Sequence, residues 1–177
     1  QEPTHWVALV SISSSSSHVH FDRCLFQPGG WPVRTTVGLV HTAAHSSIIN
    51  NYFDDIQFFR HVRPVTNKRT ALPTFSVNQY YIATAVAIDT TAGHTKLIEN
   101  NFLEAHGITV YSQESPSSPP FANGVIRRNV FYTDDRKRAG SADSDGLYYP
   151  HRHHLEWKRG ENFLIDGNRF IGGWIDY

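Results

Sequence analysis

The sequence has no methionine, a single cysteine (Cys24) and no net formal charge, with 16 basic and 16 acidic side chains among 177 residues. One cysteine cannot form an intramolecular disulfide, so a disulfide-stapled fold is excluded. The balanced charge argues against a nucleic-acid binder that depends on a broad basic face. Apolar runs of the roughly 18 residues that a membrane span needs are also missing.

Because the chain opens on Gln1 and contains no methionine, we expect a mature or partial product of a longer protein. Its length is enough for one domain with a substantial core. We therefore predict a single domain, residues 1–177, that is part of a longer chain. Phosphate loops, nucleophile elbows and dinucleotide fingerprints are absent from the sequence, which excludes the enzyme classes that those motifs mark.

What the sequence does contain is a short segment that occurs five times. The clearest copy is Phe163–Phe170, in which a short apolar strand leads into a polar corner and then to another apolar residue. Three positions of the aligned copies are occupied by Phe21, Ile48, Ile98, Ile126 and Ile165, then by Cys24, Asn51, Asn101, Asn129 and Asn168, and then by Phe26, Phe53, Leu103, Phe131 and Phe170.

The spacing of these copies predicts a stack of strands. Successive corner residues are 27 (24 to 51), 50 (51 to 101), 28 (101 to 129) and 39 (129 to 168) residues apart. A period of this size is typical of coils that share one core, because a single coil cannot bury its apolar side alone. The interval of 50 leaves room for a degenerate extra repeat, so we expect about six coils. Asn suits the corner because it tolerates the left-handed backbone region, and stacked Asn side chains can form a hydrogen-bonded ladder.

A second set of strand-like segments precedes the repeats, at residues 38–44, 85–89, 108–112 and 154–158. Two strand positions per coil, with a third that is poorly marked, fit a wound arrangement better than a sandwich, which needs hairpin signals. Three long loop insertions interrupt the coils, at residues 54–84, 113–123 and 132–152. Function often lies on such loops.

The motifs that carry a family resemblance are residues 19–24, 48–52, 126–129 and 164–170. Their repeated Ile-x-x-Asn-x-Phe pattern resembles the right-handed parallel β-helix of the pectin-lyase-like superfamily, and residues 18–177 resemble bacterial proteins described only as right-handed parallel β-helix repeat proteins. The resemblance implies an all-β solenoid. It does not indicate one function, because this fold hosts lyases, hydrolases, epimerases and adhesins.

Polar side chains on the second strand set form a predicted stripe on its outward side. β-Elimination on a uronic acid needs a base for the C5 proton, for which Lys, His or Tyr is suited, and a neutraliser of the carboxylate, such as Arg or Ca²⁺. Residues 156–158 resemble the strand-borne lysine segment of β-helical polysaccharide lyases. The candidate catalytic residues are Lys158, His41 and Tyr111, and the candidate substrate-binding residues are Glu156, Asp89 and Arg127. A solvated strand face is the alternative interpretation.

Two further clusters have side chains that bind metals. His151 and His153 would lie on one face of a strand and could begin a transition-metal site. Asp143 and Asp145 offer clustered oxygen ligands of the kind that Ca²⁺ prefers, which makes Ca²⁺ the one cofactor that the sequence suggests. A third group of charges shares one repeat position and predicts cross-strand ion pairs: Asp22, Glu99, Arg127 and Asp166.

Two functions stay open. The polar stripe and the long loops favour an extracellular, secreted or periplasmic β-helix that binds or acts on carbohydrate, as a lyase of acidic polysaccharide. The balanced charge and the lack of a capping segment favour a non-enzymatic structural or adhesive subunit. The expected partners are accordingly polysaccharide or other protein chains that cap the open ends of the coil stack.

Overall fold

A computed structural model of the chain describes residues 8–13, 15–27, 37–41, 45–56, 60–61, 84–89, 96–105, 108–113, 121–134, 147–148, 153–157 and 160–172. These residues form strands and contain no helix, so the described part of the chain is all-β. Accordingly, no helix that could cross a membrane occurs in these ranges. The predicted site residues Lys158, His151, Asp143 and Asp145 lie outside the described residues, as does most of each long insertion.

Three parallel sheets, each with five strands, account for most of the described strands. The first sheet has the order β1 (Ala8–Ile12), β4 (Val37–His41), β8 (Thr84–Asp89), β11 (Ile108–Gln113) and β16 (His153–Trp157). The second has the order β2 (His20–Asp22), β5 (Ser46–Ile49), β9 (Lys96–Glu99), β13 (Val125–Arg127) and β18 (Leu164–Asp166). The third has the order β3 (Leu25–Phe26), β6 (Tyr52–Ile56), β10 (Phe102–Ala105), β14 (Val130–Tyr132) and β19 (Arg169–Ile171).

Two small strand pairs complete the described structure. β12 (Phe121–Ala122) pairs in parallel with β17 (Gly160–Glu161), between the first and second sheets along the chain. β7 (Arg60–His61) pairs antiparallel with β15 (Leu147–Tyr148). The second pair joins the first and third of the predicted insertions, which sequence spacing alone does not connect.

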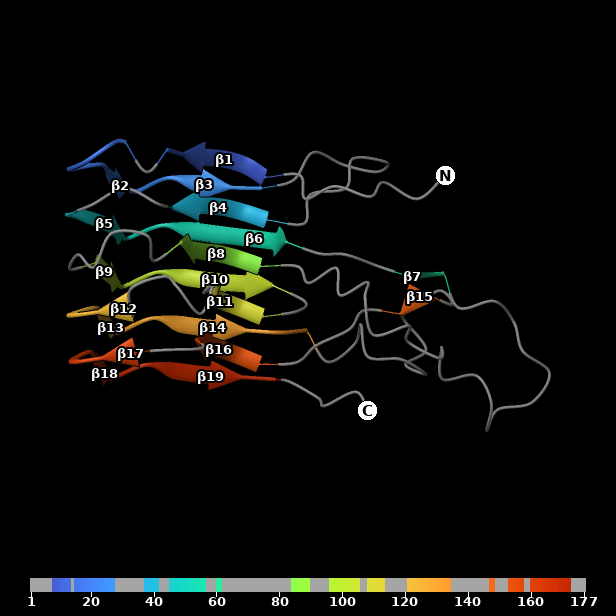
Figure 1. Cartoon of the computed structure of the whole chain (residues 1–177). Coiled ribbons are helices and arrows are strands. Elements are labelled where there is room, and N and C mark those ends of the chain that lie inside the picture. The colour runs from blue at the N-terminus through green and yellow to red at the C-terminus, as the bar shows by residue number, and fades with distance from the viewer. Residues whose placement is uncertain are drawn as a thin grey trace.

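The chain passes through the first, second and third sheets in the same order five times, and each passage is called a repeat below. Figure 1 shows the successive repeats one above another, from β1 to β19. The predicted alignment is confirmed by the register, which pairs Ile48 with Ile98, Ile98 with Ile126 and Ile126 with Ile165.

The described residues hold five repeats, so the expectation of about six was wrong. In all three sheets the strands before the 50-residue interval pair directly with the strands after it: β4 with β8, β5 with β9 and β6 with β10. An extra repeat would have to separate these pairs.

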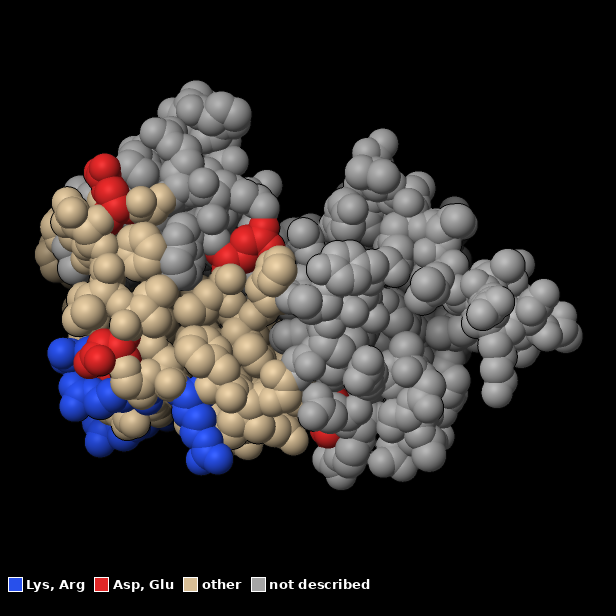
Figure 2. Space-filling view, turned by 90° about the horizontal axis from the view of Figure 1, so that it is seen from below, with Lys and Arg blue, Asp and Glu red and all other residues tan. Residues whose placement is uncertain are grey.

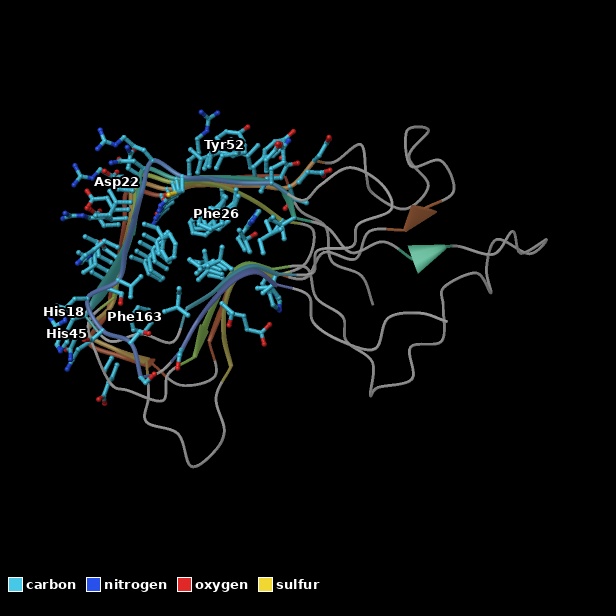
Figure 3. The ribbon with its side chains drawn as sticks, turned by 90° about the horizontal axis from the view of Figure 1, so that it is seen from above. His18, Asp22, Phe26, His45, Tyr52 and Phe163 are labelled. Carbon is cyan, nitrogen blue, oxygen red and sulfur yellow. The ribbon has the colours of Figure 1, made fainter. Side chains whose placement is uncertain are left out.

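The core lies between the sheets and is built from alternate residues of each strand. Ile98, Ile126 and Phe131 are at most 1% exposed, whereas their chain neighbours on the opposite face are half-buried. Phe26 and Phe53 stack with ring centroids 4.2 Å apart. Figure 3 shows Phe26 pointing into the space between the sheets. Burial of side chains of this size stabilises the fold by about 1.5–3 kcal/mol each.

The corner between the second and third sheets depends on one residue with a left-handed backbone in each repeat. These residues are Arg23 (φ 55°), Asn50 (φ 59°), Asn100 (φ 54°), Arg128 (φ 54°) and Gly167 (φ 58°). The sequence had assigned this conformation to the following position, which holds Cys24 and the four aligned Asn residues, and that assignment was wrong. The left-handed residue turns the chain, so the next side chain points back into the core.

Candidate functional site

The four aligned Asn residues form a ladder that is buried at its first three members and half-buried at the fourth, called the inner ladder here: Asn51, Asn101, Asn129 and Asn168. Asn101 is typical, with its Nδ2 donating to Asn129 Oδ1 (2.9 Å) and to the carbonyl oxygen of Ile48 (2.8 Å). Its Oδ1 accepts hydrogen bonds from the backbone N–H (2.8 Å) and the Nδ2 (3.1 Å) of Asn51. An amide has two donor hydrogens and two acceptor positions, so the hydrogen-bonding capacity of Asn101 is filled. The predicted ladder is confirmed, and its role is structural.

One residue earlier in the chain, a second pair of Asn side chains lies on the outside of the same corner. Asn100 Nδ2 donates to Asn50 Oδ1 (2.8 Å), and Asn50 Nδ2 donates to Asp22 Oδ1 (2.8 Å). Both Asn residues are exposed. Each uses one of its two amide hydrogens, and Asn100 Oδ1 accepts no hydrogen bond within the described part of the chain. These amides therefore retain donors and an acceptor for a ligand.

A pocket of about 350 Å³ opens at this place. Its lining is Ile49, Asn50, Glu99, Asn100 and Arg128, and this group is called the outer corner below. Pockets of about 300–1,000 Å³ are the size that holds small ligands or single units of larger ones. The lining is dominated by planar polar groups: two amides, one carboxylate and one guanidinium.

Glu99 is held in the outer corner by two arginines from the next repeat. Arg127 donates to Glu99 Oε2 at 3.0 Å, and Arg128 donates to Glu99 Oε1. The hydrogen bond from Arg127 is the largest of the effects that lower the pKa of Glu99 below its ordinary value of 4.5, and the charge of both arginines adds to it. Figure 2 shows basic side chains gathered beside an acidic group at one corner of the molecule. The contact between Arg127 and Glu99 confirms the cross-strand ion pair that the sequence predicts for these two residues.

An aromatic row continues from the outer corner onto the outer face of the third sheet. Tyr52 and Phe102 stack with ring centroids 4.6 Å apart and planes inclined by 9°, and Tyr132 follows at 5.6 Å from Phe102. Tyr52 points away from the core in Figure 3 and is 45% exposed. Because the ring faces contact one another, the ring edges and the Tyr52 hydroxyl are what solvent meets. Burial, with smaller effects from Asp54 and Glu104, raises the pKa of Tyr52, so its hydroxyl remains a donor.

The predicted polar stripe on the first sheet is only partly aligned. The backbone register places Tyr111 opposite Glu156 and Asp89 opposite Gln113. His41 instead pairs with Ile88, in the set that continues through Ser112 and Trp157. His41 is therefore one residue out of step with the Tyr111–Glu156 position in the backbone register.

The one described carboxylate of this stripe has a histidine of its own strand nearby. Glu156, with 12% of its side chain exposed, lies 3.8 Å from His153 Nε2. The described residues contain no group of three or more side chains suited to hold a metal ion, and His151, the expected partner of His153, is not among them. The metal-site predictions therefore gain no support from this part of the chain.

Two features of the site were missed by sequence reasoning. The outer-corner residues Asn50 and Asn100 were read only as neighbours of the aligned Asn column, although the doubled Asn-Asn at both places was the available signal. His154 was predicted only as the first residue of the strand-like segment 154–158, without a role for its ring. Its Nε2 lies 3.1 Å from the carbonyl oxygen of Gly172 and its Nδ1 lies 3.3 Å from Thr109 Oγ1.

Comparisons with protein-family models, curated proteins and solved structures find no match for the chain. We therefore infer fold and function from the residues described above alone.

Proposed function

We propose that the three sheets are the faces of a right-handed parallel β-helix in which each repeat forms one coil. Three observations support this proposal: the constant order of the sheets along the chain, the in-register parallel pairing of neighbouring repeats and the inner ladder. The right hand follows from the general rule that about 98% of connections between parallel strands of one sheet are right-handed.

We propose that this β-helix binds carbohydrate at the outer corner and does not act on it chemically. The observation that supports this role best is the unused hydrogen-bonding capacity of the exposed Asn50 and Asn100 amides beside the Glu99–Arg128 pair, in a pocket of about 350 Å³. Amide, carboxylate and guanidinium groups each present two hydrogen-bonding positions in one plane. That geometry matches the adjacent hydroxyl groups of a sugar ring.

The repeated geometry of the corner suits a ligand that has several sugar units. Equivalent residues of neighbouring repeats are separated by about 4.8 Å, the spacing of paired strands. An elongated saccharide that follows the repeat direction would meet Asn50 and Asn100 in turn, with the edges of Tyr52 and Phe102 beside them. An extracellular, secreted or periplasmic location would bring the protein into contact with such polymers.

Binding is favoured over catalysis by the state of the pocket carboxylate. Glu99 has a lowered pKa because Arg127 and Arg128 stabilise its charged form, so it is a weak proton acceptor. The lyase hypothesis depends instead on Lys158 and on the side chains of His41 and Tyr111, which the described part of the structure does not include.

Affinity electrophoresis in gels that contain polygalacturonate or a neutral glucan tests the proposal. We expect at least one polymer to retard the protein, and the Asn50→Gly/Asn100→Gly variant to lose most of that retardation. Glycine adopts the left-handed backbone of both positions without strain, so the substitution removes the amides and keeps the corner. Asn123→Gly is the matched control, since Asn123 is an exposed Asn with φ 55° at a different corner.

Two results of the electrophoresis would contradict the proposal. Either no polymer retards the protein, or the double variant and the Asn123→Gly control behave alike. A rise in absorbance at the unsaturated-uronate band during incubation with polygalacturonate, with or without Ca²⁺, would show lyase activity and contradict a purely binding role.

A further inference from the structure

The unused hydrogen-bonding groups of the outer corner are of both kinds, donors and acceptors. Asn50 and Asn100 each keep one amide hydrogen, and Asn100 Oδ1 accepts no hydrogen bond within the described part of the chain. The two carboxylate oxygens of Glu99 each accept one arginine N–H and have a further position for a donor. A ligand that fills the corner must therefore donate to oxygen atoms as well as accept from N–H groups.

A hydroxyl group meets this requirement, whereas a carboxylate or sulfate group does not. A hydroxyl has one O–H donor and two acceptor positions, and a deprotonated acid has acceptors only. An acid group could pair with the amide hydrogens of Asn50 and Asn100, but it would leave Asn100 Oδ1 without a donor. An acceptor that binding buries without a partner weakens the complex.

The positive charges at one end of the corner are already opposed by acidic side chains. Arg127 and Arg128 both donate to Glu99, and its lowered pKa keeps this carboxylate charged at neutral pH. Asp166, which lies opposite Arg127 in the register of the second sheet, adds a second acidic residue to this group. Two arginines and two acidic residues leave no net positive charge to attract an anionic ligand.

Charges at the other end of the corner are balanced in the same way. Asp22 accepts a hydrogen bond from Asn50 Nδ2 (2.8 Å) and forms an ion pair with Arg23 at 3.0 Å. An anion beside Asn50 would therefore meet the carboxylate of Asp22, and an anion beside Asn100 would meet that of Glu99. Like charges repel, most strongly where a bound ligand excludes water.

We propose that the outer corner selects a neutral polysaccharide, whose polar groups are hydroxyls, over polyuronides and sulfated polymers. This inference rests on the proposed carbohydrate-binding function and names the class of ligand, which differs from the acidic polysaccharide expected from the sequence. Ile49, which also lines the pocket, offers an apolar contact to the C–H face of a neutral sugar ring. Glu99 determines the selection, because its carboxylate occupies both arginines and repels a second anion.

Affinity electrophoresis with two matched pairs of polymers tests the selection. The members of each pair share one backbone: hydroxyethylcellulose with carboxymethylcellulose, and carboxyl-reduced polygalacturonate with polygalacturonate. We expect at least one neutral member to retard the protein. Its anionic counterpart at the same concentration should retard the protein at least about fivefold less, because it lacks donors for the corner and is repelled by Glu99 and Asp22.

The Glu99→Gln variant separates a charge effect from a general loss of binding. The substitution frees both arginines from the carboxylate and keeps the length of the side chain, so retardation by the anionic polymers should rise about threefold or more. Glu161→Gln is the matched control, since it removes the same charge from an exposed glutamate of β17, which is not part of the outer corner. Circular dichroism checks that both variants are folded.

Failure of the binding function and failure of the selection can be told apart. If none of the four polymers retards the protein, carbohydrate binding itself is contradicted, and the selection with it. An anionic polymer that retards the unmodified chain as strongly as its neutral counterpart would leave the binding function standing and overturn the selection. Equal behaviour of Glu99→Gln and Glu161→Gln toward the anionic polymers would show that Glu99 does not exclude them.

Discussion

Asn100 and Asn101 are the same amino acid in consecutive positions, yet the fold uses them for different purposes. Asn101 is 2% exposed, and its amide is saturated by its neighbours. Asn100 is exposed, with one hydrogen bond from its side chain. The left-handed backbone of Asn100 turns its own side chain outward and the next one inward. A corner made from two Asn residues thus holds one amide that joins the repeats and one amide that stays on the surface with unused hydrogen-bonding groups.

The largest expected effect is that of removing one buried amide. Asn101→Ala would leave the backbone N–H and one amide hydrogen of Asn51 without their acceptor inside the core. Each unsatisfied buried group costs about 1–3 kcal/mol, so we expect a loss of about 3 kcal/mol or more in the free energy of unfolding. Urea denaturation followed by circular dichroism measures it. A loss below about 1 kcal/mol would mean that the ladder contributes little net stability.

The half-buried His154 can be compared with the inner ladder because its ring, unlike an amide, changes its protonation state with pH. Burial lowers the pKa of His154 from its ordinary value of 6.5, opposed by the hydrogen bond to the carbonyl oxygen of Gly172. The folded state therefore favours the neutral ring. The contribution of the neutral His154 ring to the free energy of unfolding should be fully present above about pH 6.5. It should be lost as the pH falls from there through the lower pKa of the folded state.

Urea midpoints at pH 7.5 and pH 5.5 check this dependence. The His154→Asn variant, which lacks a titrating ring, should lose less stability between these two pH values than the unmodified chain. The same change in both proteins would show that His154 does not contribute to the acid sensitivity.

On the outer side of the corner, the ion pairs of Glu99 should contribute less than the inner ladder. Glu99→Gln removes the carboxylate that Arg127 and Arg128 share. Because the lowered pKa of Glu99 stabilises the fold above its ordinary value of 4.5, this contribution should vanish as the pH falls below that value. Added salt should also reduce the difference between the two proteins, since exposed ion pairs are screened. A difference that is unchanged by acid and by salt would contradict an electrostatic origin.

The smallest expected effect on stability is that of Asn100→Gly. This substitution keeps the left-handed corner available and removes one exposed hydrogen bond, so the free energy of unfolding should change by about 0.5 kcal/mol or less. Chemical denaturation of Asn100→Gly and Asn101→Ala in parallel measures the contrast directly. Similar losses for both would show that the two amides have the same structural role.

The alignment of the repeats could be predicted because four of them have an Asn at the ladder position, always three residues after one core residue and two residues before another. Ile98 and Ile126 share a position in the register as expected. The first sheet has no such anchor, which is why His41 was placed in step with Tyr111 and lies one residue away. The number of repeats was overestimated because a long interval looks the same whether it holds a strand layer or an insertion.

The outer corner was harder to predict for a physical reason. Repeat alignment identifies which residues share a position, but not which of two adjacent Asn residues takes the left-handed backbone. That choice depends on which side chain the core can satisfy with hydrogen bonds. Asn51 and Asn101 find acceptors among buried carbonyl groups, and Asn50 and Asn100 are left to solvent.

The inner ladder also has a consequence for how such a chain can be altered. Its Oδ1 atoms accept the backbone N–H of the residue at the same position of the preceding repeat each time, although these residues are 27, 50, 28 and 39 positions apart. The corner therefore keeps the same backbone hydrogen bond, whereas the segments that connect successive corners differ in length. This difference costs little free energy, because the entropy of closing a loop grows slowly with its size. We therefore expect foreign segments inserted between the strands to leave the hydrogen bonds of the corner intact.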